Sequence, residues 1–303
     1  MVSTNRESNH VMVEDKSSVR IVTLNRPNQL NALSSAMGKG RAFCAGADVA
    51  EVVHHINRGS YDYNPASSRI TKRDWKSGAD ISRKELTMNY VMATYSKPQV
   101  SILNGIVMGG GAGASIHGRF RIATENTLFA MPETALGLFP DVGASYFLSR
   151  LPGFFGEYVG LTGARLDGVE MLRLPLLEEA LVKADSGDSD SSAYHMLDII
   201  NKVFSRRTIE EIIAALEREA ADGKVVWISY ALDSLKKASP MSLKISLRSI
   251  REGRLQGIGK CLVREFRMLS HAMRGEVCKD FAEGCRAILL DKDQNPKRGS
   301  PPK

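Results

Sequence analysis

Two carboxyl side chains draw attention because the sequence around them is apolar. Glu133 and Asp141 lie within residues 131–143, a stretch punctuated by glycine and proline that contains no Lys, Arg or His. A carboxyl group in apolar surroundings has a raised pKa and can act as a base, an acid or a nucleophile. The simpler alternative is that one of them caps a helix or that both face water. This stretch alone does not decide between the two interpretations.

A run of glycines precedes this stretch. Residues 104–113 contain Gly109, Gly110 and Gly111 in succession, after an expected buried strand at 99–103 and before an expected helix. Glycine lets a ligand approach backbone N–H groups closely, and a following helix adds partial positive charge. The run therefore suits a phosphate or a developing oxyanion, although a tight turn is an equally good interpretation. No GK[ST] follows and the spacing is not a clean G-x-G-x-x-G, so a nucleotide-binding loop is not indicated.

A third segment, residues 40–48, is a loop of small residues that contains Cys44 and Ala47. No general base lies near Cys44 in the sequence, so we assign it no nucleophilic role. No CxxC pair occurs and no His stands at a zinc-binding spacing, which predicts reduced cysteines and no metal site. The remaining cysteines are Cys261, Cys278 and Cys285.

Together, the three segments resemble those of the crotonase (enoyl-CoA hydratase/isomerase) superfamily. In that superfamily two backbone N–H groups form an oxyanion hole for the carbonyl oxygen of an acyl-CoA thioester. The matching residues are Ala47, which follows the glycine of an A-G-x-D motif, and Gly110, in the middle of a G-G-G motif. Each such donor is worth about 3 kcal/mol in comparable sites. The resemblance implies an α/β fold with a crotonase-like core, a superhelix of ββα units.

Within the superfamily, the chain most resembles the 3-hydroxyisobutyryl-CoA hydrolase family, particularly its plant type, over most of its length but with gaps. Hydratases carry a second catalytic glutamate where this chain has Gly113, and a glycine where it has Asp141. Glu133 keeps its place, and Glu85 matches an acidic residue that contacts substrate in the hydrolases. The pattern therefore implies hydrolysis of a thioester. The stretches that carry this resemblance are 107–115, 117–121, 129–150, 161–168, 243–254 and 281–297.

The resemblance implies a small-molecule acyl-CoA substrate, with 3-hydroxyisobutyryl-CoA in valine breakdown as the favoured one. Glu133 would attack the thioester or activate a water, while Asp141 would contact the substrate hydroxyl. No metal and no cofactor are implied beyond the coenzyme A of the substrate. Two alternatives stay open, namely a hydratase or isomerase, and a truncated chain that binds acyl-CoA without turnover.

The family works in mitochondria or, for the plant type, in peroxisomes. No targeting signal for either organelle is legible at the two termini. Crotonases often form trimers, and the sequence leaves open whether this chain forms a homo-oligomer.

Composition agrees with a folded protein of this kind. The 303 residues are 43% hydrophobic and 25% charged, with a formal net charge of +7. The excess of basic residues suits the phosphates of coenzyme A, but no basic stripe with interleaved aromatics indicates nucleic acid. No membrane span is expected, because the most apolar stretch, 100–116, is broken by glycines, Asn104 and Ser115.

The scaffold expected around these residues changes character along the chain. Residues 1–168 should form the crotonase-like α/β core, with a hairpin at 11–24, and residues 169–303 a mainly helical C-terminal region. The polar stretch 58–83 reads as a surface loop. Further strands are expected at 120–123 and 127–130, and helices at 85–95, 144–151, 194–204, 208–219, 227–238, 241–252, 258–273 and 278–290.

The core is expected to be incomplete. Between Leu33 and Gly40 the family has a helix and a strand, roughly 25 residues in all, that this chain lacks. That strand belongs to the central sheet and leads into the first oxyanion loop, so its loss should leave an unpaired edge and loosen Ala47. The sequence also departs from the family after Met171 and beyond Lys297, where the family continues into C-terminal helices.

Overall fold

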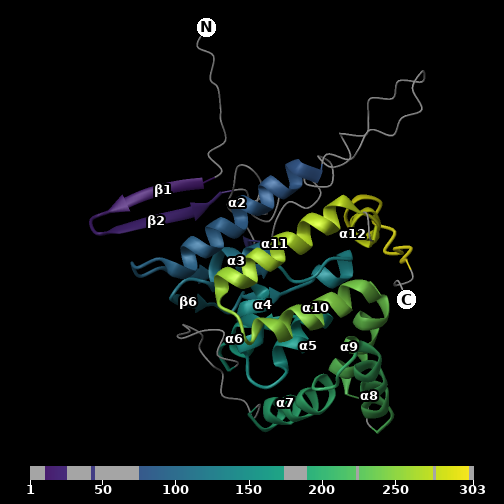
Figure 1. Ribbon diagram of the computed structural model, residues 1–303. Coiled ribbons are helices and arrows are strands. Elements are labelled where there is room, and N and C mark those ends of the chain that lie inside the picture. The colour runs from purple at the N-terminus through teal and green to yellow at the C-terminus, as the bar shows by residue number, and fades with distance from the viewer. Residues whose placement is uncertain are drawn as a thin grey trace, which may run out of the picture.

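The computed structural model combines small sheets with a layer of long helices (Figure 1). It describes residues 11–25, 42–44, 75–173, 190–222, 225–275 and 278–299. The N-terminal part contains the strands, and the C-terminal part is helical, as the sequence predicts. No helix among these residues is both long enough and apolar enough to cross a membrane.

The first element is the expected hairpin. Strand β1 (Val11–Lys16) pairs with β2 (Val19–Leu24) in antiparallel register, with Val13 opposite Val22. Ser17 in the turn takes a positive φ of 56°. The hairpin lies at one edge of the molecule, well away from helices α7 (Asp190–Phe204), α8 (Ile209–Asp222) and α9 (Val226–Lys237) (Figure 1).

Parallel pairing dominates the two inner sheets. In one, β3 (Ala42–Cys44), β5 (Ile106–Met108) and β7 (Leu128–Ala130) are parallel, and β8 (Leu166–Asp167) closes the sheet antiparallel to β7. In the other sheet, β4 (Val100–Leu103) is parallel to β6 (Phe120–Ala123).

Strand β4 departs from the expectation of a buried strand. Ser101 and Leu103 are buried, but Val100 is 53% and Ile102 59% exposed. One face of this strand therefore packs inward, and the other presents apolar side chains at the surface.

Helices of very different length connect the strands, and further helices follow the last strand. Helix α2 begins earlier than expected, since residues 75–83 belong to it and not to a surface loop. The helices of the N-terminal part are α2 (Trp75–Thr94), α3 (Gly110–Ile116), η2 (Glu133–Leu136), α4 (Ala144–Phe147), η3 (Leu148–Arg150), α5 (Phe155–Thr162) and α6 (Gly168–Arg173). Those that follow are α7 (Asp190–Phe204), α8 (Ile209–Asp222), α9 (Val226–Lys237), α10 (Pro240–Gly253), α11 (Ile258–Arg274), α12 (Asp280–Cys285) and η4 (Arg286–Leu290).

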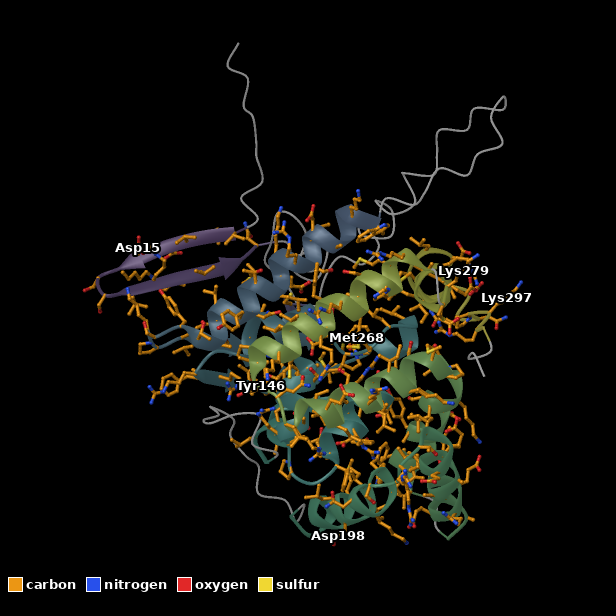
Figure 2. All side chains as sticks on the ribbon, in the orientation of Figure 1. Asp15, Tyr146, Asp198, Met268, Lys279 and Lys297 are labelled. Atoms are coloured by element: carbon orange, nitrogen blue, oxygen red, sulfur yellow. The ribbon has the colours of Figure 1, made fainter. Side chains whose placement is uncertain are left out.

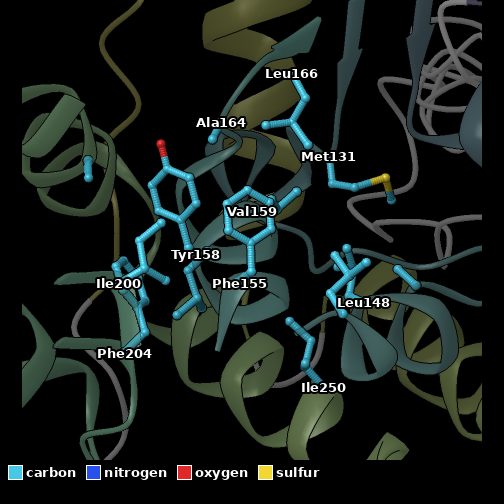
Figure 3. Close-up of a cluster of buried hydrophobic side chains, with 14 of the residues drawn as sticks. Met131, Leu148, Phe155, Tyr158, Val159, Ala164, Leu166, Ile200, Phe204 and Ile250 are labelled. Carbon is cyan, nitrogen blue, oxygen red and sulfur yellow. The ribbon is translucent and has the colours of Figure 1, made fainter. Parts of the chain in front are cut away.

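One hydrophobic cluster joins the two parts of the chain. Phe155 and Tyr158 of α5 pack with Phe204 of α7 and Ile250 of α10, and Met131 and Leu148 belong to the same cluster (Figure 3). The rings of Tyr158 and Phe204 meet edge to face, with centroids 5.6 Å apart. The cluster spans residues on both sides of Gly168, so the boundary at that residue stays a prediction.

A second hydrophobic cluster lies between α2, α11 and α12. Leu86 of α2 packs with Leu262 and Leu269 of α11 and with Phe139. Met268 of α11, labelled in Figure 2, packs against it. Helices α2 and α11 lie side by side (Figure 1). Together with α12 they cover the region around residues 138–139.

Helix α3 approaches β3 so closely that it needs a glycine. A Cβ atom at Gly111 would lie 2.0 Å from the carbonyl oxygen of Cys44. We predict that Gly111→Ala lowers the unfolding free energy by about 1–3 kcal/mol, because backbone must move to admit the methyl group. Urea unfolding followed by circular dichroism would measure the change.

The matched control is Gly257→Ala, since nothing lies within 4 Å of a Cβ at that position. Its unfolding free energy should change by no more than about 0.5 kcal/mol. Equal losses in the two variants would show that α3 and β3 are not packed as described.

Candidate functional site

The site is built around the turn that leads from β5 into α3. The N–H of Gly109 still continues the ladder, donating to the Ala130 carbonyl at 3.3 Å, and Gly109 takes a positive φ of 50°. Gly110 then opens the helix and is buried. Its N–H has no acceptor among the residues that the structure describes, as expected in a first helical turn, so it is available to a ligand oxygen.

Glu133 points its carboxyl group at this turn. It follows β7, opens η2 and is only 6% exposed. A Cβ atom at Gly109 would lie 2.7 Å from its Oε1, so the carboxyl group fills the space that the glycine leaves. Its other oxygen, Oε2, is buried without a hydrogen-bond partner in the described part of the chain.

Asp141 enters the site on an unusual turn. The residues after it, Val142 and Gly143, take φ values of 52° and 84°. A β-branched residue at positive φ is rare, and such backbone strain costs about 1–3 kcal/mol. The turn is closed by a hydrogen bond from the N–H of Ala144 to the Asp141 carbonyl, at 2.8 Å.

The same turn explains why Gly113 has no side chain. A Cβ at Gly113 would lie 2.5 Å from Cβ of Val142 and 3.1 Å from Nδ2 of Asn89. A glutamate at this position therefore cannot be accommodated unless the turn after Asp141 moves. The packing of Val142 and Asn89 therefore excludes a glutamate at position 113, directly beside the turn that carries Asp141.

Helix α2 closes the site from the side. Asn89 donates from Nδ2 to the carbonyl of Gly113 at 2.9 Å. Glu85 lies one helical turn earlier on the same face. Oε1 of Glu85 and Oδ1 of Asn89 are buried, and neither has a hydrogen-bond partner within the described ranges. With Oε2 of Glu133, three oxygens without a partner in the described ranges thus lie around the segment from Gly109 to Gly113. Such a set of oxygens favours a polar ligand there.

The carboxyl groups affect one another's ionisation. The pKa of Glu133 is raised to about 8, mainly by burial and to a smaller extent by the nearby Glu85 and Glu265. Burial likewise raises the pKa of Glu85 to about 7 and that of Glu265 to about 7. The pKa of Asp141 is raised well above its usual range, first by burial and then by Glu85, Glu133 and Glu265. Such a cluster can hold both a proton donor and an ionised carboxylate near neutral pH.

The structure thus brings together Glu85, Gly110, Glu133 and Asp141, whereas Ala47 lies outside the described residues. The sequence interpretation missed Asn89, His117 and Glu265. A signal for Glu265 exists, because it falls on the buried stripe of α11 with Cys261, Leu262, Leu269 and Met273. Within the described ranges, no group of three or more His, Cys, Asp or Glu side chains is placed to hold a metal ion.

The chain is similar in sequence to known proteins. The chain is 59% identical to 3-hydroxyisobutyryl-CoA hydrolase 1 of Arabidopsis thaliana over 339 aligned residues, which cover 95% of this chain and 86% of the relative. It is 40% identical over 343 residues to 3-hydroxyisobutyryl-CoA hydrolase-like protein 1, mitochondrial, of the same plant, covering 96% of this chain and 82% of the relative. Both alignments exceed the 303 residues of the chain, so these relatives carry residues that have no counterpart here.

A solved structure and a family model agree with these relatives. A crystal structure of an enoyl-CoA hydratase from Rhodobacter sphaeroides 2.4.1 superposes with a TM-score of 0.82 at 31% identity, covering 96% of this chain and 92% of that one. The expected crotonase-like fold is thereby confirmed. The model for the enoyl-CoA hydratase/isomerase family matches residues 37–300. The shared fold, the sequence identity and the carboxyl groups around the glycine turn agree with one another, and the chain belongs to the enoyl-CoA hydratase/isomerase family.

Proposed function

We propose that this chain hydrolyses acyl-CoA thioesters and that its substrate is 3-hydroxyisobutyryl-CoA, an intermediate of valine breakdown. The observation that carries the proposal is the turn after Asp141. It fills the place of a second glutamate at Gly113, while Glu133 lies against Gly109, the residue before Gly110. The 59% identical Arabidopsis relative, named for this reaction, supports the same substrate.

The mechanism follows from the positions of these groups. The thioester carbonyl oxygen accepts a hydrogen bond from the Gly110 N–H, with a second donor expected from Ala47. The Glu133 carboxylate adds to the carbonyl carbon, the carbon–sulfur bond breaks, and the departing thiolate takes a proton from Asp141. Water then hydrolyses the mixed anhydride, which releases the acid and restores the Glu133 carboxylate. Alternatively, Glu133 removes a proton from a water that attacks the carbonyl carbon directly.

A hydratase is the less favoured alternative, although the superposed crystal structure bears that name. Water addition to a double bond needs two carboxyl groups on the glycine-run and η2 loops, and the packing at Gly113 admits none on α3. A chain that binds acyl-CoA without turnover is the second alternative, and the experiment on Glu133 below separates it from an enzyme.

Location and assembly also belong to the proposal. The relative that is 40% identical is named mitochondrial, which supports a mitochondrial location for this chain, while a peroxisomal one stays a prediction. We propose no cofactor beyond the coenzyme A of the substrate. A homo-oligomer also stays a prediction.

Replacing Glu133 should abolish turnover. Release of free thiol from 3-hydroxyisobutyryl-CoA should fall at least a hundredfold, roughly, in Glu133→Ala, because the variant lacks the attacking or proton-accepting group. Glu125→Ala, at an exposed position in the turn between β6 and β7, is the matched control and should retain wild-type turnover. A folded wild type that binds the thioester but releases no thiol would favour the non-catalytic alternative.

The pH profile should reflect the raised pKa of Glu133. Since the reactive form is the carboxylate, kcat/KM should rise with pH and level off above about 8, the pKa that burial gives this group. A pH–rate profile from pH 5 to 9 would measure this rise. A profile already flat from pH 5 upward would mean that Glu133 is fully ionised throughout, contrary to its burial.

Labelled water tests whether Glu133 is the nucleophile. If Glu133 forms the anhydride and water attacks its side of it, a single turnover in water enriched in oxygen-18 places label in the Glu133 carboxyl group and passes one unlabelled oxygen of Glu133 to the product acid. If water attacks the acyl carbon instead, Glu133 keeps both of its oxygens and the product takes its new oxygen from water, as it does when Glu133 is a general base. Mass spectrometry of the acid and of the peptide containing Glu133 would detect the transfer. Label in Glu133 after one turnover would establish the anhydride, whereas an unlabelled Glu133 would exclude water attack on the Glu133 side of it.

A further inference from the structure

A buried glutamate on α11 holds the turn that carries Asp141. Oε2 of Glu265 accepts a hydrogen bond from the N–H of Gly143 at 2.7 Å, and its Oε1 accepts from the N–H of Ser145 at 3.0 Å. The hydroxyl of Ser145 donates to the same Oε1 at 2.5 Å. Glu265 is 0% exposed and lies 120 residues or more from its partners in the sequence. One side chain of the C-terminal region therefore binds both residues that flank Ala144.

The turn is held from its other side by His117. Nε2 of His117 lies 2.7 Å from the Val142 carbonyl, which can only accept, so this nitrogen carries the proton. Burial lowers the pKa of His117, consistent with a neutral ring. His117 and Glu265 thus bind the carbonyl and the N–H of the same peptide group, which joins Val142 and Gly143, the two positive-φ residues after Asp141.

The site of Glu265 shows little other reason for a carboxyl group. It falls on the apolar stripe of α11, where a hydrophobic side chain would pack at lower desolvation cost. Glu265 forms no ion pair with any residue in the described segments. Its neighbour Arg264 donates to the Ser249 carbonyl at 2.7 Å and to Gln256 at 2.5 Å. The three bonds to the turn are therefore what offsets its burial.

We infer that Glu265 is a positioning residue, which directs Asp141 toward the substrate hydroxyl and so sets the preference for 3-hydroxyacyl thioesters. This inference rests on the proposed function and on the contact between Asp141 and the substrate hydroxyl that the family resemblance implies. A displaced turn would lose discrimination for the hydroxyl, whereas a merely structural defect would lower all activities together.

Isobutyryl-CoA provides the probe, because it lacks only the hydroxyl group of 3-hydroxyisobutyryl-CoA. Wild type should favour the hydroxylated thioester roughly tenfold or more in kcat/KM, as for a hydrogen bond to a buried group. In Glu265→Gln this ratio should fall at least fivefold, roughly, because the amide has one acceptor oxygen and sets its NH2 against a backbone N–H. The ratio does not depend on the concentration of folded enzyme.

Glu157→Gln is the matched control. Glu157 is also 0% exposed, but it bonds Arg254 through both oxygens, at 2.8 and 2.9 Å, and does not touch the turn. This variant should lose stability without changing the ratio. If Glu265→Gln does not fold, Ser145→Ala decides instead, because it removes one of the three bonds and should shift the ratio in the same direction by a smaller factor.

The outcomes separate the two proposals. Wild type that hydrolyses neither thioester would defeat the proposed function, and the ratio of the two dissociation constants, measured by calorimetry, would then decide the inference. The inference on Glu265 would be overturned if the ratio for the two thioesters, measured by turnover or by binding, were equal in wild type and Glu265→Gln. It would also be overturned if the ratio fell equally in Glu157→Gln, or if wild type showed no preference for the hydroxylated thioester.

Discussion

The turn at Val142 and Gly143 is the constraint on which the geometry of the site depends. Its positive φ values turn the Val142 side chain onto Gly113, at a distance that leaves no room for a Cβ there. Such a conformation persists only where its surroundings hold it, and here His117 and Glu265 do so. The turn that carries Asp141 and a side chain at position 113 therefore exclude each other, because Val142 occupies the space that a Cβ at 113 would need.

The electrostatics of the site follow from that geometry. Four elements, namely α2, η2, the turn and α11, each contribute one carboxyl group, of which Glu133 and Glu265 are buried and Glu85 and Asp141 half-buried. Loss of contact with water raises the pKa of all four. None of the four forms an ion pair within the described residues, so the raised pKa values limit the negative charge that the cluster carries near neutral pH. Unpartnered buried oxygens are costly in the free protein, and a ligand with hydroxyl, carbonyl and water partners would relieve that cost.

Much of this could be predicted from the sequence where a local pattern exists. The hairpin, β6, β7 and the amphipathic helices α7 to α11 lie within a few residues of their expected positions. Helix α5 was missed because all eight of its residues are buried, so it has no alternation of apolar and polar faces. The start of α2 was misread because Ser77, Asp80 and Ser82 make it resemble a loop.

The same limit applies to the site, where the sequence reveals residues in contiguous motifs but not those that act through tertiary contacts. Gly110, Glu133 and Asp141 stand in contiguous motifs that the family resemblance identifies. Asn89 and Glu265 act through tertiary contacts with residues 24 and at least 120 positions away, and no local pattern encodes such contacts. Only a charged residue on an apolar stripe hinted at Glu265.

The scaffold supports the two halves of the site unequally. Helix η2, which carries Glu133, is supported by the C-terminal region. Arg298 donates to the carbonyls of Asp280 and Ala135, and Gly284 packs directly on the Leu136 carbonyl. The oxyanion half rests on β3, whose three residues pair with β5 through a register shift. The residues that the relatives carry in addition would therefore affect the oxyanion donor expected from Ala47 before they affect Glu133 or Asp141. Loss of one such donor lowers kcat by about 10²–10³-fold, a large but measurable deficit, so the chain can retain the chemistry of Glu133 and Asp141 on a reduced scaffold.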